Sequence, residues 1–284
     1  MLSCLAAFCI ALLRSFLPRS SPSSLSITFS RFIDMTSIPL TFCLGFRNWY
    51  IEHLHHALDS LRRITTDEII VVDYGSGEHA ASAIKNLCST FTSRYLREES
   101  DLWSRARALN RASREARTEY IVCTDADMIF PSSWYKSVQS QLVPSGLFLT
   151  RTRDLPPTLP ETQVAFEDEN WLIENSVLHP TVGQGGAMVI PRAWFVAVGG
   201  FDERFTVWCC EDNDLVIRAL WSKIPVRWFD QTFVAHQWHW RDWPTPEEIE
   251  LVKSHRRYFA ERIAAGGPIV RNQQGGDEHG KSQA

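Results

Sequence analysis

Two aspartates separated by one residue, Asp125 and Asp127, close an apolar run at 120–124 that predicts a short buried strand. Two carboxylates held this close repel each other unless a cation or hydrogen-bond donors compensate their charge. A hard divalent ion together with a nucleotide diphosphate is the usual compensation. Capping of the next helix is the alternative role for an acid at a strand end, and it explains Asp73, in the run 68–74, equally well.

A second acidic group lies in the segment 183–218, where Glu211, Asp212 and Asp214 open a predicted helix. The helix dipole alone favours acids in a first turn, so this role fits them as well as catalysis does. Trp208 lies three residues upstream of Glu211 and favours catalysis, because a sugar ring packs on a flat apolar face.

The elements that position these acids alternate between strands and helices. Apolar runs predict strands, and apolar residues at helical spacing predict helices. The predicted strands are 38–46, 68–74, 94–97, 120–124, 146–152 and 232–235, and the predicted helices are 49–61, 80–87, 103–117 and 132–142. A Pro-rich acidic segment, 154–182, is expected to cross the active face. Alternation of this kind predicts a mostly parallel, doubly wound α/β sheet flanked by helices, with its ligand site beyond the carboxyl ends of the strands.

Composition narrows the class of protein further. With 284 residues, 44% hydrophobic and 22% charged, the chain can bury a sizeable core, which excludes wholesale disorder. A net charge of −4 gives no basic field, so we expect no nucleic-acid partner. The seven cysteines form no C-x-x-C pair, which argues against a disulfide scaffold or a zinc finger and favours a reducing compartment.

Residues 1–34 differ from the rest of the chain. Their uncharged run, 2–13, is shorter than the roughly 20 residues of a membrane-spanning helix. It resembles the apolar part of a signal peptide but lacks a preceding Lys or Arg. We favour a translation start at Met35 over a membrane anchor. Residues 35–263 then form a single α/β domain, and the Gly- and Gln-rich residues 264–284 form a flexible tail.

Several short segments between residues 38 and 243 occur in the order of one known family's motifs. They are G-F-R-N-W at 45–49, S-R-A-R-A-L-N at 104–110, T-D-A-D-M at 124–128, F-D-E-R-F-T-V-W-C-C-E-D-N-D at 201–214, and H-Q-W-H with a following R-D at 236–242. Together they resemble nucleotide-sugar glycosyltransferases of the GT-A (Rossmann-like) fold, most closely the β-1,4-galactosyltransferase superfamily. Chondroitin-type and polypeptide N-acetylgalactosaminyltransferases have a similar C-terminal signature, which leaves the sugar open.

This resemblance implies a role for each matching residue. The donor and nucleotide contacts that it implies are Phe46, Arg47, Asn48, Arg105 and Asp125, and Asp73 is added to them from its place at a strand end. Among these, Arg105 is expected to reach the donor diphosphate and Asp125 the ribose or sugar. Trp208 and Glu211 match acceptor-binding residues, and Asp212 matches the catalytic base, with Glu211 beside it.

The metal site that the resemblance implies consists of Asp127, His236 and His239. Two histidines at the end of a strand can also be ordinary polar residues beneath an aromatic cover, here Trp238, Trp240 and Trp243. One aspartate supplies too few ligands for a six-coordinate ion, however, and imidazole nitrogens are acceptable to Mn²⁺. We therefore expect a site for Mn²⁺ or Mg²⁺, with the carboxylate and at least one imidazole within roughly 5 Å of each other.

The chain departs from the family pattern at Cys209 and Cys210, which stand where the family has paired glycines before Glu-Asp. The glycines supply backbone amides close to the donor, so two side chains there narrow the site or change the acceptor.

The sequence thus predicts a metal-dependent glycosyltransferase. The enzyme is expected to move a galactose or N-acetylhexosamine from a UDP-sugar to a saccharide, glycan or other hydroxyl acceptor, with inversion. The alternatives are a retaining transferase of the same fold, a UDP-sugar-forming nucleotidyltransferase and a catalytically silent carbohydrate-binding relative. A cytoplasmic location is expected, with peripheral membrane association allowed but not required, or the secretory lumen if residues 1–34 are an anchor.

Overall fold

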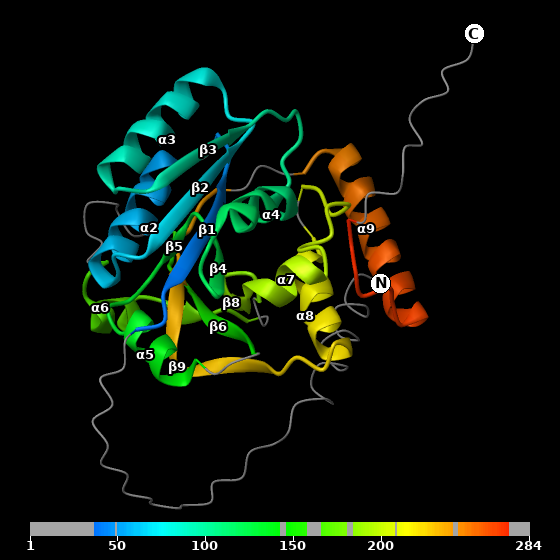
Figure 1. The fold of residues 1–284 in the computed structure, drawn as a ribbon. Coiled ribbons are helices and arrows are strands. Elements are labelled where there is room, and N and C mark those ends of the chain that lie inside the picture. The colour runs from blue at the N-terminus through cyan, green and yellow to red at the C-terminus, as the bar shows by residue number, and fades with distance from the viewer. Residues whose placement is uncertain are drawn as a thin grey trace, which may run out of the picture. The chain divides into compact units, whose positions relative to one another are not determined.

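Figure 1 shows the fold in a computed structural model, which describes residues 37–48, 50–142, 146–157, 166–180, 184–207, 209–240 and 244–272. All of these residues fall in one compact unit, Ser37–Ala284. The predicted N-terminal extension, 1–34, lies outside the described residues. Within the described ranges, no helix has the length and apolar character needed to cross a bilayer.

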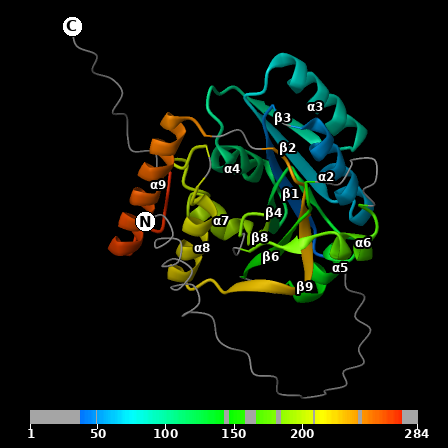
Figure 2. The same cartoon turned by 180° about the vertical axis from the view of Figure 1, so that it is seen from behind.

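Four parallel strands form the first half of the sheet. They are β1 (Leu40–Phe46), β2 (Glu68–Tyr74), β3 (Arg94–Glu98) and β4 (Tyr120–Asp125), in the order β3-β2-β1-β4. β1, β2 and β4 are buried along nearly their whole length, as expected of parallel strands covered on both faces. Figures 1 and 2 show α2 (Ile51–Ile64) and α3 (Glu78–Thr90) on one face and α4 (Arg105–Glu115) on the other.

The second half of the sheet is mixed. β4 pairs antiparallel with β8 (Ala187–Pro191), β8 antiparallel with β6 (Leu147–Asp154), and β6 parallel with β9 (Val226–His236). Two short strands, β5 (Met128–Ile129) and β7 (Val177–Leu178), pair antiparallel with β9 and β6. The remaining helices are α5 (Trp134–Gln141), α6 (Glu169–Glu174), α7 (Arg192–Ala197), α8 (Glu211–Trp221) and α9 (Pro246–Ala265).

The predicted α/β domain with a sheet flanked by helices is confirmed, and its strand directions are now explicit. The sheet is parallel from β3 to β4 and again between β6 and β9, whereas β8 and the two short strands run antiparallel. β9 begins at Val226, six residues before the predicted strand 232–235. Its first residues, 226–228, already pair with β6, and the pairing resumes at Phe233 after a register shift between Leu149 and Arg151.

Aromatic packing supports the strand end that carries the paired aspartates. The ring of Phe130, just after β5, lies 4.9 Å from Trp134 and 5.8 Å from Phe42 between centroids, each pair edge to face or tilted. Trp134 is fully buried and donates from Nε1 to Thr150 Oγ1 at 3.4 Å. The turn between β4 and β5 is therefore supported by closely packed aromatic side chains.

The chain after α9 packs back against α8. The helix ends where Gly266 adopts a left-handed φ of +65°. Arg271 is then buried and forms ion pairs with Asp202 at 3.0 Å and Asp214 at 2.8 Å. The described part of the predicted tail, 264–272, thus belongs to the domain rather than to a flexible extension.

Candidate active site

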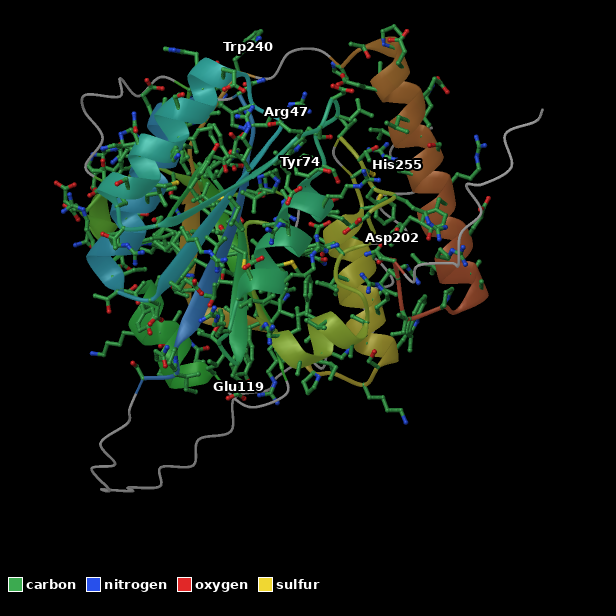
Figure 3. The ribbon with its side chains drawn as sticks, turned by 45° about the horizontal axis from the view of Figure 1, so that its top comes forward. Arg47, Tyr74, Glu119, Asp202, Trp240 and His255 are labelled. Atoms are coloured by element: carbon green, nitrogen blue, oxygen red, sulfur yellow. The ribbon has the colours of Figure 1, made fainter. Side chains whose placement is uncertain are left out.

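The carboxyl ends of β1, β2 and β4 meet at one edge of the sheet. The buried Phe46 pairs with Asp73, and Asp125 lies beside the residue of β1 that precedes Phe46. In Figure 3, Tyr74 marks this edge, and Glu119, just ahead of β4, marks the opposite one. The predicted nucleotide-binding residues therefore share the edge at which doubly wound sheets bind ligands.

Asn48 ties together two loops at this edge. Its side-chain Oδ1 accepts a hydrogen bond from Gly77 N at 2.8 Å, and its backbone N donates to Ser76 Oγ at 3.0 Å. Arg47, its neighbour, donates to the backbone oxygen of Asp101 at 2.8 Å. Arg47 and Asn48, both predicted nucleotide contacts, thus lie in a loop that hydrogen bonds fix at the carboxyl edge of the sheet.

Asp73 is fully buried, and both of its oxygens are engaged by the protein. Oδ1 accepts from Ser76 N at 3.0 Å, and Oδ2 accepts from the Tyr95 hydroxyl at 2.8 Å and from Arg97 at 3.3 Å. These bonds stabilise the turn after β2, as expected if Asp73 has a structural role rather than a ligand-binding one. A contact between Asp73 and the nucleotide stays a prediction.

The three predicted metal ligands, Asp127, His236 and His239, converge, and we call them the histidine cluster. One ligand atom from each lies within 4.8 Å of the others, and Asp127 Oδ2 is 3.4 Å from Nε2 of both histidines. Asp127 lies between β4 and β5, and the pairing of β5 with β9 brings it to the end of β9, where His236 lies. The backbone N of Gln237 then donates to Asp127 O at 3.0 Å.

The donor set of the histidine cluster suits a divalent cation. Asp127 is 7% exposed, and its Oδ1 has no hydrogen-bond partner among the described residues. A buried carboxylate oxygen in this state is costly, and a cation satisfies it. One carboxylate and two imidazoles suit Mn²⁺ better than Mg²⁺, which prefers oxygen ligands alone.

The histidines keep Asp127 ionised. Burial alone raises the pKa of Asp127, but hydrogen bonds with His236 and His239 hold that pKa well below its usual range. Burial lowers the pKa of His236, yet Asp127 and then Asp154 outweigh burial and raise it to about 9. The cluster therefore favours a positive charge beside Asp127.

Two residues beside the cluster were missed by sequence reasoning. Asp154 ends β6, pairs with His236 across β6 and β9, and has its Oδ1 3.1 Å from His236 Nδ1. His179 follows β7, and its Nδ1 is 2.5 Å from Asp154 Oδ2. The position of Asp154 after an apolar strand was a usable signal, as it was for Asp125. The sequence around His179 has no motif or periodicity that would have identified this residue.

Arg105 joins a second group of predicted residues. Its Nε donates to Asp125 Oδ1 at 2.5 Å, Nη1 is 3.5 Å from Glu211 Oε1, and Nη2 donates to Gly185 O at 2.7 Å. Burial alone lowers the pKa of Arg105, but Asp125 and Glu211 raise it further above its ordinary value. Because these protein acceptors engage its donors, a contact between Arg105 and the donor diphosphate stays a prediction.

Glu211 and Asp212 begin α8 next to Arg105. Burial and the charge of Asp212, opposed by Arg105, raise the pKa of Glu211 to about 7. Asp212 is half-buried, and a Cβ placed on Gly185 would lie 3.2 Å from its Oδ2 and 3.3 Å from Arg105. Two adjacent acids in different environments are a common arrangement for proton transfer.

The loop before α8 keeps a glycine-like backbone without glycine. Cys209 and Cys210 have φ of +150° and +71°, and Val207 has φ of +64°. A side chain in the left-handed region costs about 1–2 kcal/mol, so the cysteines replace the expected glycines at a cost in backbone strain. Trp208, the predicted acceptor-stacking residue, lies outside the described residues.

Comparison with known families matches two parts of the chain. Residues 46–145 match the sequence model of glycosyl transferase family 2, and residues 178–239 match one described as the N-terminal domain of galactosyltransferase. Among curated proteins, the chondroitin synthase of Escherichia coli is 26% identical over 206 residues, which is 60% of this chain. The chain spans 30% of that relative's length.

Solved structures share the fold at low sequence identity. GalNAc-T7 with UDP, GalNAc and Mn²⁺ has a TM-score of 0.58 and 15% identity, covering 83% of this chain and 52% of its own. The mannosyltransferase PcManGT from Pyrobaculum calidifontis, with GDP-Man and Mn²⁺, has a TM-score of 0.55 and 17% identity, covering 92% and 85%. S. aureus TarS 1-349 with UDP-GlcNAc has a TM-score of 0.55 and 13% identity, covering 78% and 66%.

Proposed function

We propose that the chain is a nucleotide-sugar glycosyltransferase of the GT-A type that moves galactose or an N-acetylhexosamine from UDP to a saccharide hydroxyl with inversion. One observation carries this proposal: Asp125 and Asp127 divide between two groups at the same sheet edge. Asp127 belongs to the histidine cluster, and Asp125 is paired with Arg105 beside the acids of α8. The proposed metal ligands and a pair of acids thus both lie at one strand end, which supports the proposal.

UDP is the proposed nucleotide of the donor. Two of the structural neighbours contain UDP or UDP-GlcNAc, and one contains GDP-Man. Phe46, Arg47, Asn48 and Asp73 are the proposed contacts of the nucleoside, because they surround the ends of β1 and β2. Arg105 and Asp125 are the proposed contacts of the diphosphate and the sugar.

Mn²⁺ is the proposed metal, with Mg²⁺ as the alternative. The supporting observations are the mixed oxygen and nitrogen donors of the histidine cluster and the partnerless Asp127 Oδ1 among the described residues. When bound, a divalent cation neutralises the negative charge that develops on the departing diphosphate. Asp127, His236 and His239 are the residues that would hold it.

Asp212 is the proposed catalytic base. Its half-buried carboxylate takes the proton of the acceptor hydroxyl while that oxygen attacks the anomeric carbon and the bond from carbon to the diphosphate breaks. A single displacement of this kind inverts the configuration at carbon. Glu211, with a pKa of about 7, is proposed to bind the acceptor, together with Trp208.

Two other functions stay under test. A retaining transferase would share this fold, and a silent carbohydrate-binding relative is compatible with cysteines in the loop before α8. The proposed location is the cytoplasm or the membrane periphery, with the secretory lumen as the alternative if residues 1–34 act as an anchor.

The test is a panel of UDP- and GDP-sugars assayed for Mn²⁺-dependent hydrolysis and transfer. We expect UDP-sugar turnover, and we expect Asp212→Asn to lower it by roughly 10²–10⁴-fold while UDP affinity is preserved. The control is Glu250→Gln, an exposed acid on α9. Wild-type turnover in Asp212→Asn would show that Asp212 is not the base. Sugar binding that needs no metal and leads to no turnover would favour a catalytically silent carbohydrate-binding protein.

A further inference from the structure

We propose that Asp154 and His179 are positioning residues of the metal site. They hold the His236 ring so that its Nε2, and not its Nδ1, faces the cation. The inference rests on the proposed metal site, and it adds two residues that neither the motifs nor the family matches single out.

Sheet pairing brings Asp154 to His236. The two residues are directly paired in the register of β6 and β9, and Leu155 N donates to His236 O at 3.0 Å. The side chains then meet, with Asp154 Oδ1 3.1 Å from His236 Nδ1. Because backbone pairing sets this contact, its geometry does not depend on the flexibility of a loop.

The contact decides which ring nitrogen is available for a metal. A carboxylate accepts hydrogen bonds and does not donate them, so Nδ1 of His236 must carry the proton that it shares with Asp154. Nε2 is on the opposite side of the ring, 3.4 Å from Asp127 Oδ2. Nε2 therefore faces the histidine cluster, and its lone pair becomes available to a cation that displaces its proton. A carboxylate that orients a metal-binding histidine in this way raises the basicity of the ligand.

His179 holds the other oxygen of Asp154. Its Nδ1 is 2.5 Å from Asp154 Oδ2, so each carboxylate oxygen serves one imidazole. The backbone of His179 is also anchored, because its N donates to Thr152 O at 3.0 Å after β7 has paired with β6. With both oxygens engaged, Asp154 cannot rotate away from His236 without also breaking its contact with His179.

The contact of Asp154 with the cluster is made through His236. The other histidine, His239, has its Nδ1 3.3 Å from the backbone oxygen of Trp240. The effect of Asp154 on metal affinity is therefore expected to pass through the His236 ring.

The experiment is a calorimetric titration of the full chain with MnCl₂, without donor or acceptor. Asp154→Ala should weaken Mn²⁺ binding by about 10–100-fold, and Asp154→Asn by less, because an amide oxygen still accepts the bond from Nδ1. His179→Ala should weaken binding by a smaller factor than Asp154→Ala. Asp59→Asn is the matched control, an acid of similar exposure (34% against 27%) that pairs with Arg63 away from the site.

A double-mutant cycle distinguishes positioning from a general loss of charge. In the His236→Ala background, Asp154→Ala should cause no further loss of affinity, because the ring through which it acts is gone. Full additivity, unchanged affinity in Asp154→Ala, or an equal loss in Asp59→Asn overturns the inference. Melting curves without metal monitor folding, and Asp154→Asn replaces Asp154→Ala in the cycle if the latter does not fold.

The outcomes also distinguish this inference from the proposed function. If the wild-type chain does not bind Mn²⁺, the metal site and the positioning role fail together. If Mn²⁺ binding is lost in His236→Ala but unchanged in Asp154→Ala, the metal site stands and only the positioning role fails.

Discussion

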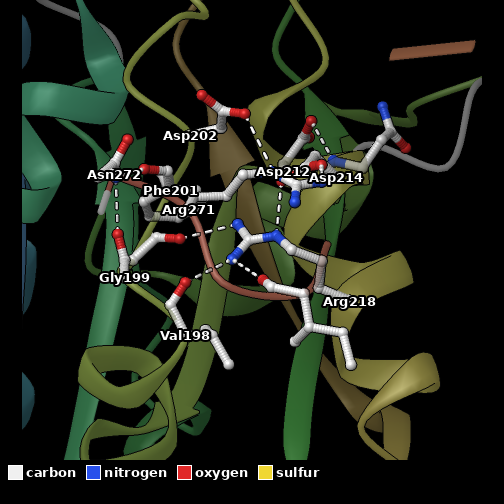
Figure 4. Close-up of polar contacts among 12 residues, drawn as sticks. Val198, Gly199, Phe201, Asp202, Asp212, Asp214, Arg218, Arg271 and Asn272 are labelled. Carbon is white, nitrogen blue, oxygen red and sulfur yellow. Dashed lines mark hydrogen bonds and ion pairs between the residues drawn. The ribbon is translucent and has the colours of Figure 1, made fainter. Parts of the chain in front are cut away.

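The histidine cluster and a charged cluster behind α8 both contain buried acids, but they neutralise those acids in different ways. Behind α8, Asp214 pairs with Arg218 at 2.7 Å and with Arg271 at 2.8 Å, and Asp202 pairs with Arg271 at 3.0 Å (Figure 4). We call these four residues the arginine network. Two acids and two guanidinium groups balance there without any ligand.

Within the network, Arg218 has further acceptors, whereas Arg271 Nη1 has no hydrogen-bond partner among the described residues. The guanidinium of Arg218, which is fully buried, donates to the backbone oxygens of Val198 at 3.2 Å and Gly200 at 2.7 Å (Figure 4). In the histidine cluster, Asp127 faces no guanidinium, its Oδ1 has no partner among the described residues, and imidazoles are neutral once a cation displaces their protons. Permanent cations thus balance the acids of the network, whereas the acid of the histidine cluster leaves a place for a cation.

The largest expected effect tests the network. Arg218→Met should lower the free energy of unfolding by about 3–5 kcal/mol, because it breaks a buried ion pair and removes donors to two buried carbonyls. Urea unfolding measures it, with Lys253→Ala in an exposed pair as the control, expected to change by less than about 1 kcal/mol. A loss for Arg218→Met no larger than that of the control would contradict a structural role for the network.

Glu211, on the same helix as Asp214, gives the next effect, which depends on pH. Burial and Asp212 raise its pKa from 4.5 to about 7, so its ionisation costs folding free energy. Wild-type stability should fall as the pH rises through this interval, by up to about 3 kcal/mol. Residue 211 does not ionise in the Glu211→Gln variant. The free energy of unfolding of this variant minus that of the wild type should therefore be larger at pH 8 than at pH 5. An equal stability difference at both pH values in urea unfolding would refute the shift.

The stabilisation by added metal should depend on the histidine cluster and not on the arginine network. At about 100 times its dissociation constant, Mn²⁺ should stabilise the wild type by about 2.7 kcal/mol, and a chelator should reverse the gain. Asp127→Asn should lose most of this gain. Tyr258→Phe, which removes a hydroxyl that donates to Asp202 of the arginine network, should keep the stabilisation by Mn²⁺. Thermal unfolding with and without Mn²⁺ is the measurement, and a gain that survives in Asp127→Asn would move the metal elsewhere.

The smallest expected effect lies at the edge of the network. The hydroxyl of Tyr258 donates to Asp202 Oδ2 at 2.7 Å, and Arg271 still faces Asp202 when that bond is removed. Tyr258→Phe should therefore cost only about 1 kcal/mol in urea unfolding. A loss as large as that of Arg218→Met would mean that the hydroxyl, rather than the arginines, neutralises Asp202.

Much of the fold and part of the site could be predicted because their signals are local. The run 68–74 forms β2 with the predicted bounds, since a buried parallel strand is recognisable from continuous apolar residues. Asp125 and Asp127 followed another such run, so their place at the carboxyl edge followed from the topology. The histidines of the histidine cluster were found through motif order, and the structure brings them to Asp127.

Residues that meet only through long-range pairing could not be predicted. Asp154 reaches His236 across 82 positions of sequence, through the register of β6 and β9. Arg271 reaches Asp214 across 57 positions, after a helix whose end looked like the start of a tail. Neither separation has a period or a motif, so the sequence alone offers no reason to pair them.

The distance of Arg271 along the chain has a consequence for biosynthesis. Asp214 and Arg218 are made 57 or fewer residues before Arg271, which at about 5–20 residues per second is a wait of about 3–11 seconds. During that interval Asp214 of α8 lacks one of its two arginines, so this helix cannot reach its final packing while the ribosome is still upstream of residue 271. The region that carries the proposed base is therefore expected to mature last, after the parallel half of the sheet has already left the ribosome.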